Sequence, residues 1–524
     1  MKLKLNILLI VFLSSSAFVW SGGQAAEGSG AEKLEISWFG LNNRGVLLPE
    51  DSVSELYIEE RYKVELLPWY ETDMYQKDQR NLRMASGDIP DFMKIGPQGS
   101  LSELGAVREL PKEMLYAHMP KYIAVVDEID SEAAWAGVNV DGKNMGIPGV
   151  NVAVSSGVTM VTRRDWMEAV GVEIPKKKML DYHYADDWSL DDIEELLLKY
   201  VNDDPDGNGK KDTYGVSNYS GNSPSWAGAW VFFANEFGAF GVRIHSWQDV
   251  NGKLSYTNIW PEYRDALSYL NGWYEKGIID PEIVSDGRAE FNRKYTNNIV
   301  GAFEQTSAWT GPRTQGPVGL LLAANPDAEP VYFVGFAGPD GKRGTVNRPA
   351  GGFGSVSIGA NTSDEKAIRI MQILDDVQAD MEVYHKVTKG DEGVHYSIDN
   401  DGLMVINKEF GTAEAITNMG WMYFTMWNVI TPDITLSRFP RWRMIPHRIG
   451  KENGYQLDAG FRPNLNEKFR STEGELKSIE NEFFWKAILG EIDIDKEWDG
   501  YVASWKKNGG DELTEEVNRQ RDGS

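Results

Sequence analysis

The stretch Lys33-Leu34-Glu35-Ile36-Ser37-Trp38 alternates polar and apolar residues, which is the pattern of a strand with one buried face. A second alternating run, Lys63 to Pro68, follows a candidate helix, and Asp91 to Ile95 indicates a third, short strand. Between the second and third strands, from Asp73 to Ser86, apolar residues recur at helical spacing. Strand, helix, strand, helix and strand in this order predict an α/β domain with a largely parallel sheet.

A second set of elements begins after Gly146-Ile147-Pro148-Gly149, because Gly157 to Val161 has the composition of a strand in a new sheet. Ser189 is placed as the N-cap of a helix that runs to Val201, with acidic residues in its first turn. The other expected elements are helices around Asp165 to Ala169, from Pro261 to Gly277 and from Ser363 to Ala379, a strand from Val300 to Phe303, and a helical, aromatic C-terminal third.

The segment Asp204-Pro205-Asp206-Gly207-Asn208-Gly209-Lys210-Lys211-Asp212 places oxygen donors at alternate positions around two glycines. A calcium loop supplies oxygens from positions 1, 3, 5, 7 and 9, the seventh through a backbone carbonyl. The segment therefore predicts a Ca²⁺ site whose ligands are Asp204, Asp206, Asn208, Lys210 and Asp212.

The calcium-type loop lacks one ligand of a calcium sensor. Its twelfth position is Gly215, where a sensor would carry a bidentate Glu, so the expected site is structural rather than regulatory. The alternative is a solvated turn without metal, because Asp, Asn and Gly favour turns on their own.

The N-terminus has the pattern of an export signal on a chain whose 524 residues suffice for two or three domains. Lys2 and Lys4 precede an apolar run from Leu5 to Leu13, and Gly23-Gln24-Ala25 is a candidate cleavage site. We therefore assign residues 1–25 to a signal peptide and expect an exported protein, since no further apolar run reaches the ~20 residues of a membrane span.

The sequence has no cysteine and a net charge of −26. The first property excludes thiol nucleophiles, thiolate zinc sites and lipid attachment through Cys; Ser21 stands where a lipoprotein would carry its anchoring Cys. The second repels polyanions, so neither nucleic acid nor an anionic membrane is expected as a partner.

Several segments occur in an informative order: Met84 to Asp91, Gly142 to Pro148, Thr162 to Trp166, the calcium-type loop, Trp273 to Asp280, Asn298 to Phe303 and Ile492 to Trp498. In this order they resemble the extracellular solute-binding proteins of ABC importers. The resemblance is greatest to the large oligosaccharide-binding branch, which includes alginate-binding periplasmic proteins and LplA-like lipoproteins. It covers essentially the whole chain after the signal.

The resemblance implies a two-lobed α/β fold of the type II periplasmic-binding-protein kind, with a hinge of several crossing segments. We assign residues 32–150 and about 300–360 to the first lobe, and about 151–299 and about 361–485 to the second, which carries the calcium-type loop at 204–213. Residues 486–524 are assigned to a C-terminal helical segment. In the family the calcium ligands map onto the five residues named above, and the next position, often acidic, is Thr213 here, which predicts a weaker or more hydrated site.

The function that the resemblance implies is a monomeric receptor, not an enzyme, that binds an oligosaccharide and delivers it to the membrane subunits of an ABC importer. Its expected location is the periplasm or the outer face of the cell membrane. The sugar, its linkage and its chain length stay open.

Aromatic residues make up 11% of the chain, including 18 Trp, and sugar-binding sites pair such flat faces with planar polar groups. Trp38 follows the first strand, at the end where open α/β sheets place ligands, and Arg348 offers a planar fork of donors. Each Trp has core packing as its alternative role, and Arg348 a surface ion pair. The candidate contact residues are Trp38, Trp226, Trp230, Trp309, Arg348, Trp421 and Trp427.

A secreted, calcium-stabilised glycoside hydrolase or polysaccharide lyase is the alternative function. The pairs Asp186-Asp187 and Asp375-Asp376 could imitate glycosidase carboxylates, but their charge-rich helical contexts favour solvated faces. The six His residues do not cluster, and no phosphate-binding loop is present. A third alternative, an adhesion module, would predict repeats or an anchor, and the sequence shows neither.

Overall fold

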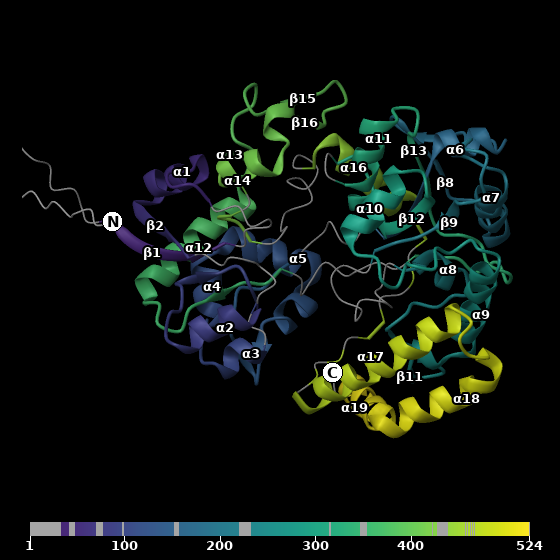
Figure 1. The fold of residues 1–524 in the computed structure, drawn as a ribbon. Coiled ribbons are helices and arrows are strands. Elements are labelled where there is room, and N and C mark those ends of the chain that lie inside the picture. The colour runs from purple at the N-terminus through teal and green to yellow at the C-terminus, as the bar shows by residue number, and fades with distance from the viewer. Residues whose placement is uncertain are drawn as a thin grey trace, which may run out of the picture.

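The computed structural model describes residues 33–40, 48–69, 77–96, 99–150, 157–219, 232–313, 316–345, 354–421, 423–426, 439–455, 457, 460–461, 463, 465 and 467–522. These residues form two lobes that lie side by side, each built on its own sheet (Figure 1). The signal peptide predicted over residues 1–25 lies outside the described residues. Among the described residues, no helix combines the length and the apolar character needed to cross a membrane.

The first lobe is built on a four-stranded sheet in the order β14-β3-β1-β2. β1 (Leu34–Phe39) pairs in parallel with β2 (Val64–Pro68) and with β3 (Phe92–Met93), which confirms the parallel sheet predicted from the sequence. The last strand, β14 (Ser357–Ile358), pairs antiparallel with β3 although it comes far later in the chain.

Helices cover the first sheet and bury its apolar side chains. α1 (Val53–Tyr62) begins with a capping box formed by Ser52 and Glu55, which satisfies backbone N–H groups at the helix start. The core joins Ile36 of β1 to Leu374 of a later helix. The remaining elements of this lobe are α2 (Lys77–Ala85), α3 (Gly99–Glu103), α4 (Lys112–His118), α5 (Pro120–Ala136), β4 (Asn139–Val140), β5 (Lys143–Asn144), α12 (Asp364–Ala379), α13 (Met381–Lys389), β15 (Tyr396–Ile398), β16 (Met404–Ile406) and α14 (Ala413–Asn418).

The second lobe is built on a six-stranded mixed sheet in the order β7-β8-β13-β6-β12-β9. β6 (Val158–Arg163), predicted as the start of a second sheet, pairs antiparallel with both β12 (Val300–Thr306) and β13 (Pro330–Phe333). The outer strands β8 and β9 pair in parallel with β13 and β12, and β7 closes one edge. Their bounds are β7 (Lys177–Met179), β8 (Tyr182–Ala185) and β9 (Tyr214–Val216).

α7 (Leu190–Asn202) shows how the sequence sets the helices of the second lobe. Ser189 caps it as predicted, because the Ser189 hydroxyl accepts from the backbone N–H of Asp192 at 3.2 Å. Its buried residues recur every three or four positions and face the sheet. The other elements of this lobe are α6 (Arg164–Ala169), α8 (Ala234–Ala239), β10 (Trp247–Val250), β11 (Lys253–Tyr256), α9 (Pro261–Glu275), α10 (Arg288–Thr296), α11 (Pro317–Ala324) and α16 (Arg441–Asn453).

Three C-terminal helices pack on the second lobe: α17 (Glu467–Ile488), α18 (Ile494–Trp505) and α19 (Asp511–Asp522). Helical structure is present as predicted but begins earlier, at Glu467. The buried carboxylate of Glu480 ties these helices to the lobe, since it accepts from Trp505 Nε1 at 2.9 Å and Asn258 Nδ2 at 3.0 Å.

The division of the chain into lobes that the sequence predicts is wrong for two segments. β12 and β13 pair with β6, so residues 300–345 complete the second sheet and not the first lobe. β14 pairs with β3, so Ser357–Ile358 lies in the first lobe as predicted, but α12 packs in the same core as β1 and belongs to the first lobe, not the second. The predicted extension of the second lobe over 361–485 is therefore wrong up to Met426 and correct from Phe439 onward. Pairing between distant strands depends on tertiary packing, which local patterning does not reveal.

The two lobes are joined covalently at three places. Residues on either side of 151–156, of 346–353 and of 427–438 belong to different lobes, so the chain passes between the lobes within each of these ranges. This connectivity agrees with the hinge of several segments that the sequence resemblance implies.

A non-covalent clasp also joins the lobes at the β15–β16 hairpin, which lies between them beside α16 in Figure 1. Arg441 of α16 binds Asp399 at 2.7 Å and Asp401 at 2.6 Å on the hairpin, and Asp181 of its own lobe at 2.7 Å. Leu403 of the hairpin is buried in the second lobe's core with Phe439. We call these contacts the Arg441 clasp.

Replacing Arg441 with Ala should lower the free energy of unfolding by about 1–2 kcal/mol, because three carboxylates would then face one another without a cation. Urea unfolding measures this change. Arg264→Ala is the matched control: its pair with Asp265 is exposed, so its effect should stay below about 0.5 kcal/mol.

The effect of Arg441→Ala should depend on pH. Burial alone would raise the pKa of Asp399, but the Leu403 amide and the Arg441 guanidinium outweigh it and hold this pKa below its usual value. A lowered acid pKa contributes stability that is present above the unfolded-state pKa and is lost as pH falls through the folded-state value. The difference between the two proteins should therefore shrink below about pH 4; a pH-independent difference would contradict the assignment to Asp399.

Candidate functional site

The calcium-type loop forms a compact turn after α7. The backbone N–H groups of Asn208 and Gly209 donate to the Asp204 carboxylate at 3.0 and 2.9 Å. The Asn208 side-chain amide donates to Asp206 at 2.8 Å and to Asp212 at 3.1 Å. All three predicted carboxylates are therefore gathered around Asn208.

Electrostatics in this loop favour a cation. Partial burial raises the pKa of Asp206 above its usual value, and the neighbouring Asp204 and Asp212 carboxyls add to the rise. A Ca²⁺ ion would relieve this repulsion, and rotation of the Asn208 amide would turn its oxygen toward the carboxylates.

However, the side chains of the loop do not show the ligand arrangement of an occupied metal site. Within the described ranges, no group of three or more His, Cys, Asp or Glu side chains is placed to hold a metal ion. Thr213, the position that is often acidic in the family, points inward: its hydroxyl donates to the Tyr200 carbonyl at 2.6 Å. The oxygen donors from Asp204 to Asp212 therefore suit a cation by their chemistry. Thr213 adds no further ligand to them.

Trp309 lies at the end of β12 in a stack with a buried cation. The guanidinium carbon of Arg443 is 4.1 Å from the Trp309 ring centroid and 4.0 Å from that of Phe439. Trp309 is half-buried, so part of the indole stays accessible. A second guanidinium, that of Arg313, lies 5.9 Å from the same centroid. An indole held by cations is a rigid platform for an apolar ligand face.

Close backbone contact holds this stack together. Gly311 lies against α16 so tightly that a Cβ atom would be 1.6 Å from the Trp442 carbonyl oxygen, and only glycine fits there. Burial lowers the pKa of His447 on the same helix to about 3, with Lys451 and Arg443 adding to the effect, so His447 is neutral at physiological pH. The cationic character of the stack therefore comes from arginine.

Trp38, predicted as a contact residue, lies in the core of the first lobe with 0% of its surface exposed. Its ring packs on Phe92 at 4.1 Å, and its N–H donates to the Tyr423 carbonyl at 3.4 Å. An indole without exposed surface offers no face to a ligand, so in this structure Trp38 is a packing residue.

Trp421 is also largely buried, at 4% exposure, and packs on the rings of His395 and Phe410. Its indole N–H has no hydrogen-bond partner in the part of the chain that the structure describes. Among the sequence-predicted contacts that the structure describes, Trp309 thus exposes the most aromatic surface. Trp226, Trp230, Arg348 and Trp427 lie outside the described residues.

Sequence reasoning missed Arg443 and Phe439, because the contact with Trp309 spans more than a hundred residues of chain. Trp69, which follows β2, has the Arg83 guanidinium carbon 3.8 Å from its ring centroid, but it is buried at 7% exposure and packs in a core with Phe39.

A pair of buried acids lies between α8 and β12, the strand that precedes Trp309. Glu304 of β12 accepts hydrogen bonds from the Ala234 backbone at 2.7 Å and from the Asn235 amide. Glu236 of α8 interacts with Glu304, and both acids are fully buried. Burial raises the pKa of Glu304 to about 7 and that of Glu236 well above its usual value.

Comparison with known proteins connects this geometry to a function. The chain is 24% identical to lipoprotein LipO of Bacillus subtilis (strain 168) over 489 residues, which cover 90% of this chain and 88% of LipO. It is 22% identical to the polygalacturonan/rhamnogalacturonan-binding protein YtcQ of the same strain over 526 residues, 98% of each chain. No family model matches the sequence.

Solved structures share the fold over nearly the whole chain. The substrate-binding protein FusA of an ABC transporter of S. pneumoniae, in complex with kestose, has a TM-score of 0.70 at 17% identity and covers 93% of this chain and 99% of its own. The alginate-binding protein AlgQ2, solved without calcium ion, has a TM-score of 0.67 at 17% identity over 94% of this chain and 98% of its own. The chain has the type II solute-binding fold.

This result confirms the two-lobed fold and the resemblance to ABC-importer solute-binding proteins that the sequence predicts. The relatives are binding proteins and not enzymes. Two of the similar structures also have a connection with calcium. AlgQ2 was solved without calcium ion, and FusA was also solved as an EF-hand mutant.

Glu236→Gln should stabilise the solute-binding fold increasingly as pH rises. A carboxyl whose folded-state pKa is raised takes up a proton on folding, so it disfavours the folded state as pH rises above the unfolded value. Gln removes this cost, so the gain in free energy of unfolding over the parent should be larger at pH 8 than at pH 5. Urea unfolding at several pH values measures the difference. Glu168→Gln, at an exposed pair with Arg164, should show no such growth; a flat difference for Glu236→Gln would contradict the prediction.

Proposed function

We propose that this protein is an exported, monomeric receptor that binds an oligosaccharide between its lobes and delivers it to the membrane subunits of an ABC importer. The observation that carries the proposal is the full-length correspondence, in sequence with YtcQ and in fold with FusA and AlgQ2. These proteins are named for saccharide ligands: polygalacturonan or rhamnogalacturonan, kestose and alginate.

The Trp309 stack supports the same proposal from this chain's own residues. It provides an accessible aromatic face beside a buried arginine, and sugars present apolar C–H faces edged with hydroxyls. Arg443 and Phe439 hold the indole in place, so binding would not have to order it. Trp421, Trp226, Trp230, Trp427 and Arg348 stay proposed contacts.

Trp309→Ala should weaken binding of the cognate sugar by about 2 kcal/mol, roughly 30-fold, with little change in melting temperature. Trp309→Phe should recover part of the affinity, because a flat apolar face remains. Calorimetry against kestose, oligogalacturonides and alginate oligosaccharides measures this. Trp260→Ala is the matched control, a half-buried Trp of the same lobe outside the stack.

Two results would oppose the receptor proposal. Unchanged affinity in a normally folded Trp309→Ala variant would remove the stack from the binding site. New reducing ends or unsaturated products on incubation with polysaccharides would instead favour the hydrolase or lyase alternative.

We further propose that the loop holds Ca²⁺ through Asp204, Asp206, Asn208, Asp212 and the Lys210 carbonyl. The carboxylates gathered around Asn208 and the raised pKa of Asp206 support this. A bound ion would brace the connection between α7 and β9, because the loop joins these two elements directly. Its role there is structural.

Chelation by EGTA should lower the melting temperature, since a ligand present at 100 times its Kd stabilises the folded state by about 2.7 kcal/mol. Asp204→Ala should reproduce the loss without EGTA, whereas Asp203→Ala, an exposed neighbour outside the ligand positions, should not. Differential scanning calorimetry on protein verified as metal-loaded or metal-free provides the readout. Identical melting of the two forms would refute the site.

A further inference from the structure

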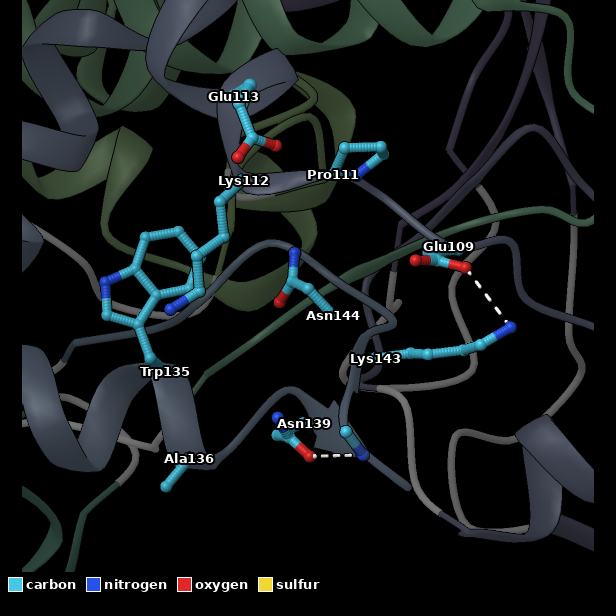
Figure 2. A pocket seen from close by; sticks show the side chains of 10 residues that line it. Glu109, Pro111, Lys112, Glu113, Trp135, Ala136, Asn139, Lys143 and Asn144 are labelled. Carbon is cyan, nitrogen blue, oxygen red and sulfur yellow. Dashed lines mark hydrogen bonds and ion pairs between the residues drawn. The ribbon is translucent and has the colours of Figure 1, made fainter.

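A cavity of about 400 Å³ opens on the first lobe, and none of the contact residues predicted from the sequence lines it. It lies where the start of α4, the end of α5 and the β4–β5 hairpin meet, and its lining residues fall between Glu109 and Asn144 (Figure 2). The receptor function proposed above does not use this cavity.

The cavity has a preorganised aromatic wall. Trp135 lines it, and its indole N–H donates to Asp127 at 2.9 Å. The same carboxylate accepts from the Tyr116 hydroxyl at 2.7 Å, and the Tyr116 ring stacks on Trp135 with centroids 6.0 Å apart. The indole is therefore fixed before any ligand arrives, which lowers the entropy cost of binding.

The polar lining offers one acceptor and one donor in fixed positions. The Asn144 amide nitrogen donates to the backbone carbonyls of Leu110 and Gly146, at 2.7 and 3.0 Å, which fixes the amide and leaves its oxygen without a hydrogen-bond partner among the described residues. A buried acceptor of this kind gains from a ligand hydroxyl. In Asn139 it is the oxygen of the side-chain amide that is bound, because it accepts from the Gly142 N–H at 3.0 Å. The N–H₂ group of Asn139 makes no hydrogen bond to the described residues.

The charges that line the cavity cancel. Lys143 pairs with Glu109 at 3.4 Å, and Lys112 and Glu113 supply one further charge of each sign. The Lys112 ammonium rests 4.5 Å from the Trp135 ring centroid and makes no ion pair within the described residues. It is exposed, so a ligand can displace it from the ring toward the rim. A balanced lining in a chain with a net charge of −26 favours an uncharged ligand.

We propose that this cavity is a second saccharide site, which holds one neutral sugar ring on Trp135. Hydroxyl groups of that ring would donate to Asn144 Oδ1 and accept from Asn139 and Lys112. An aromatic face combined with amide and ammonium groups at its edge is the chemistry that recognises a polyhydroxylated ring. A single stacked ring predicts weak binding, with a Kd of about 1 mM.

Nitrogen-15 labelling of the Trp indoles gives a direct test by NMR in the full chain. Kestose, maltotriose and trigalacturonate serve as probes, and the Trp135 signal is assigned by its loss in Trp135→Phe. The two neutral sugars should shift the Trp135 signal with saturation, and trigalacturonate should not. Asn144→Ala should weaken the neutral sugars about 5-fold or more, whereas Trp260→Phe, on the second lobe, should leave them unchanged.

Three outcomes would overturn the proposal. One is a Trp135 signal that does not move at ~50 mM of either neutral sugar, far above the expected Kd. Another is an equal, non-saturating shift of the Trp260 signal, which would indicate non-specific contact. The third is unchanged binding in Asn144→Ala. Calorimetry on Trp135→Ala separates this site from the receptor function: binding between the lobes should persist there, and its absence in both proteins would refute the receptor function alone.

Discussion

The first lobe completes its sheet and its core with segments that come after the strands of the second sheet in the chain. Its sheet is completed by β14, which pairs with β3, and its core is completed by α12, whose Leu374 packs beside Ile36. These contacts join residues that are far apart in the chain. Bringing them together lowers the conformational entropy of the chain between them, a cost that contacts within one helix or hairpin do not have. The result is two separate cores tied by three passages of the chain. Several crossings of the chain between two lobes are the connectivity of hinge-type proteins.

The Arg441 clasp adds a contact that the passages alone do not provide. Leu403 enters the second lobe's core, while Asp399 and Asp401 bind Arg441 at the surface of the same joint. A buried apolar anchor resists separation, and exposed ion pairs tolerate small changes of angle. The hairpin is therefore suited to stay attached as the lobes move, and it places the joint near α16, the helix that also carries Arg443. α16 carries both Arg441 of the clasp and Arg443 of the Trp309 stack, so a movement of the clasp would also move the stack.

Local patterning predicted the elements well and their assembly poorly. The alternation in Leu34–Phe39, the Ser189 cap and the strand at Val158–Arg163 depend on neighbours in the chain, and all three are present. The lobe assignment of β12 and α12 depends on partners far away and was wrong. The same limit applies to the candidate contacts: Trp38 was chosen for its place at a strand end, but Tyr423 and Phe424 cover it from the far end of the chain. The positions of Trp226, Trp230, Arg348 and Trp427 stay predictions.

The exposure of the ring separates Trp38, which packs, from Trp309 and Trp135, which can bind. Trp38 packs against Phe92 and Phe424. These apolar neighbours bury its ring, so no face of the indole is left for a ligand. Trp309 and Trp135 are half-buried and instead have Arg443 and Lys112 over their faces. A cation can lie over the face of an indole without covering it with hydrocarbon. Arginine, planar and buried at 6% exposure, suits a permanent platform, whereas the exposed lysine suits a face that opens when a ligand arrives.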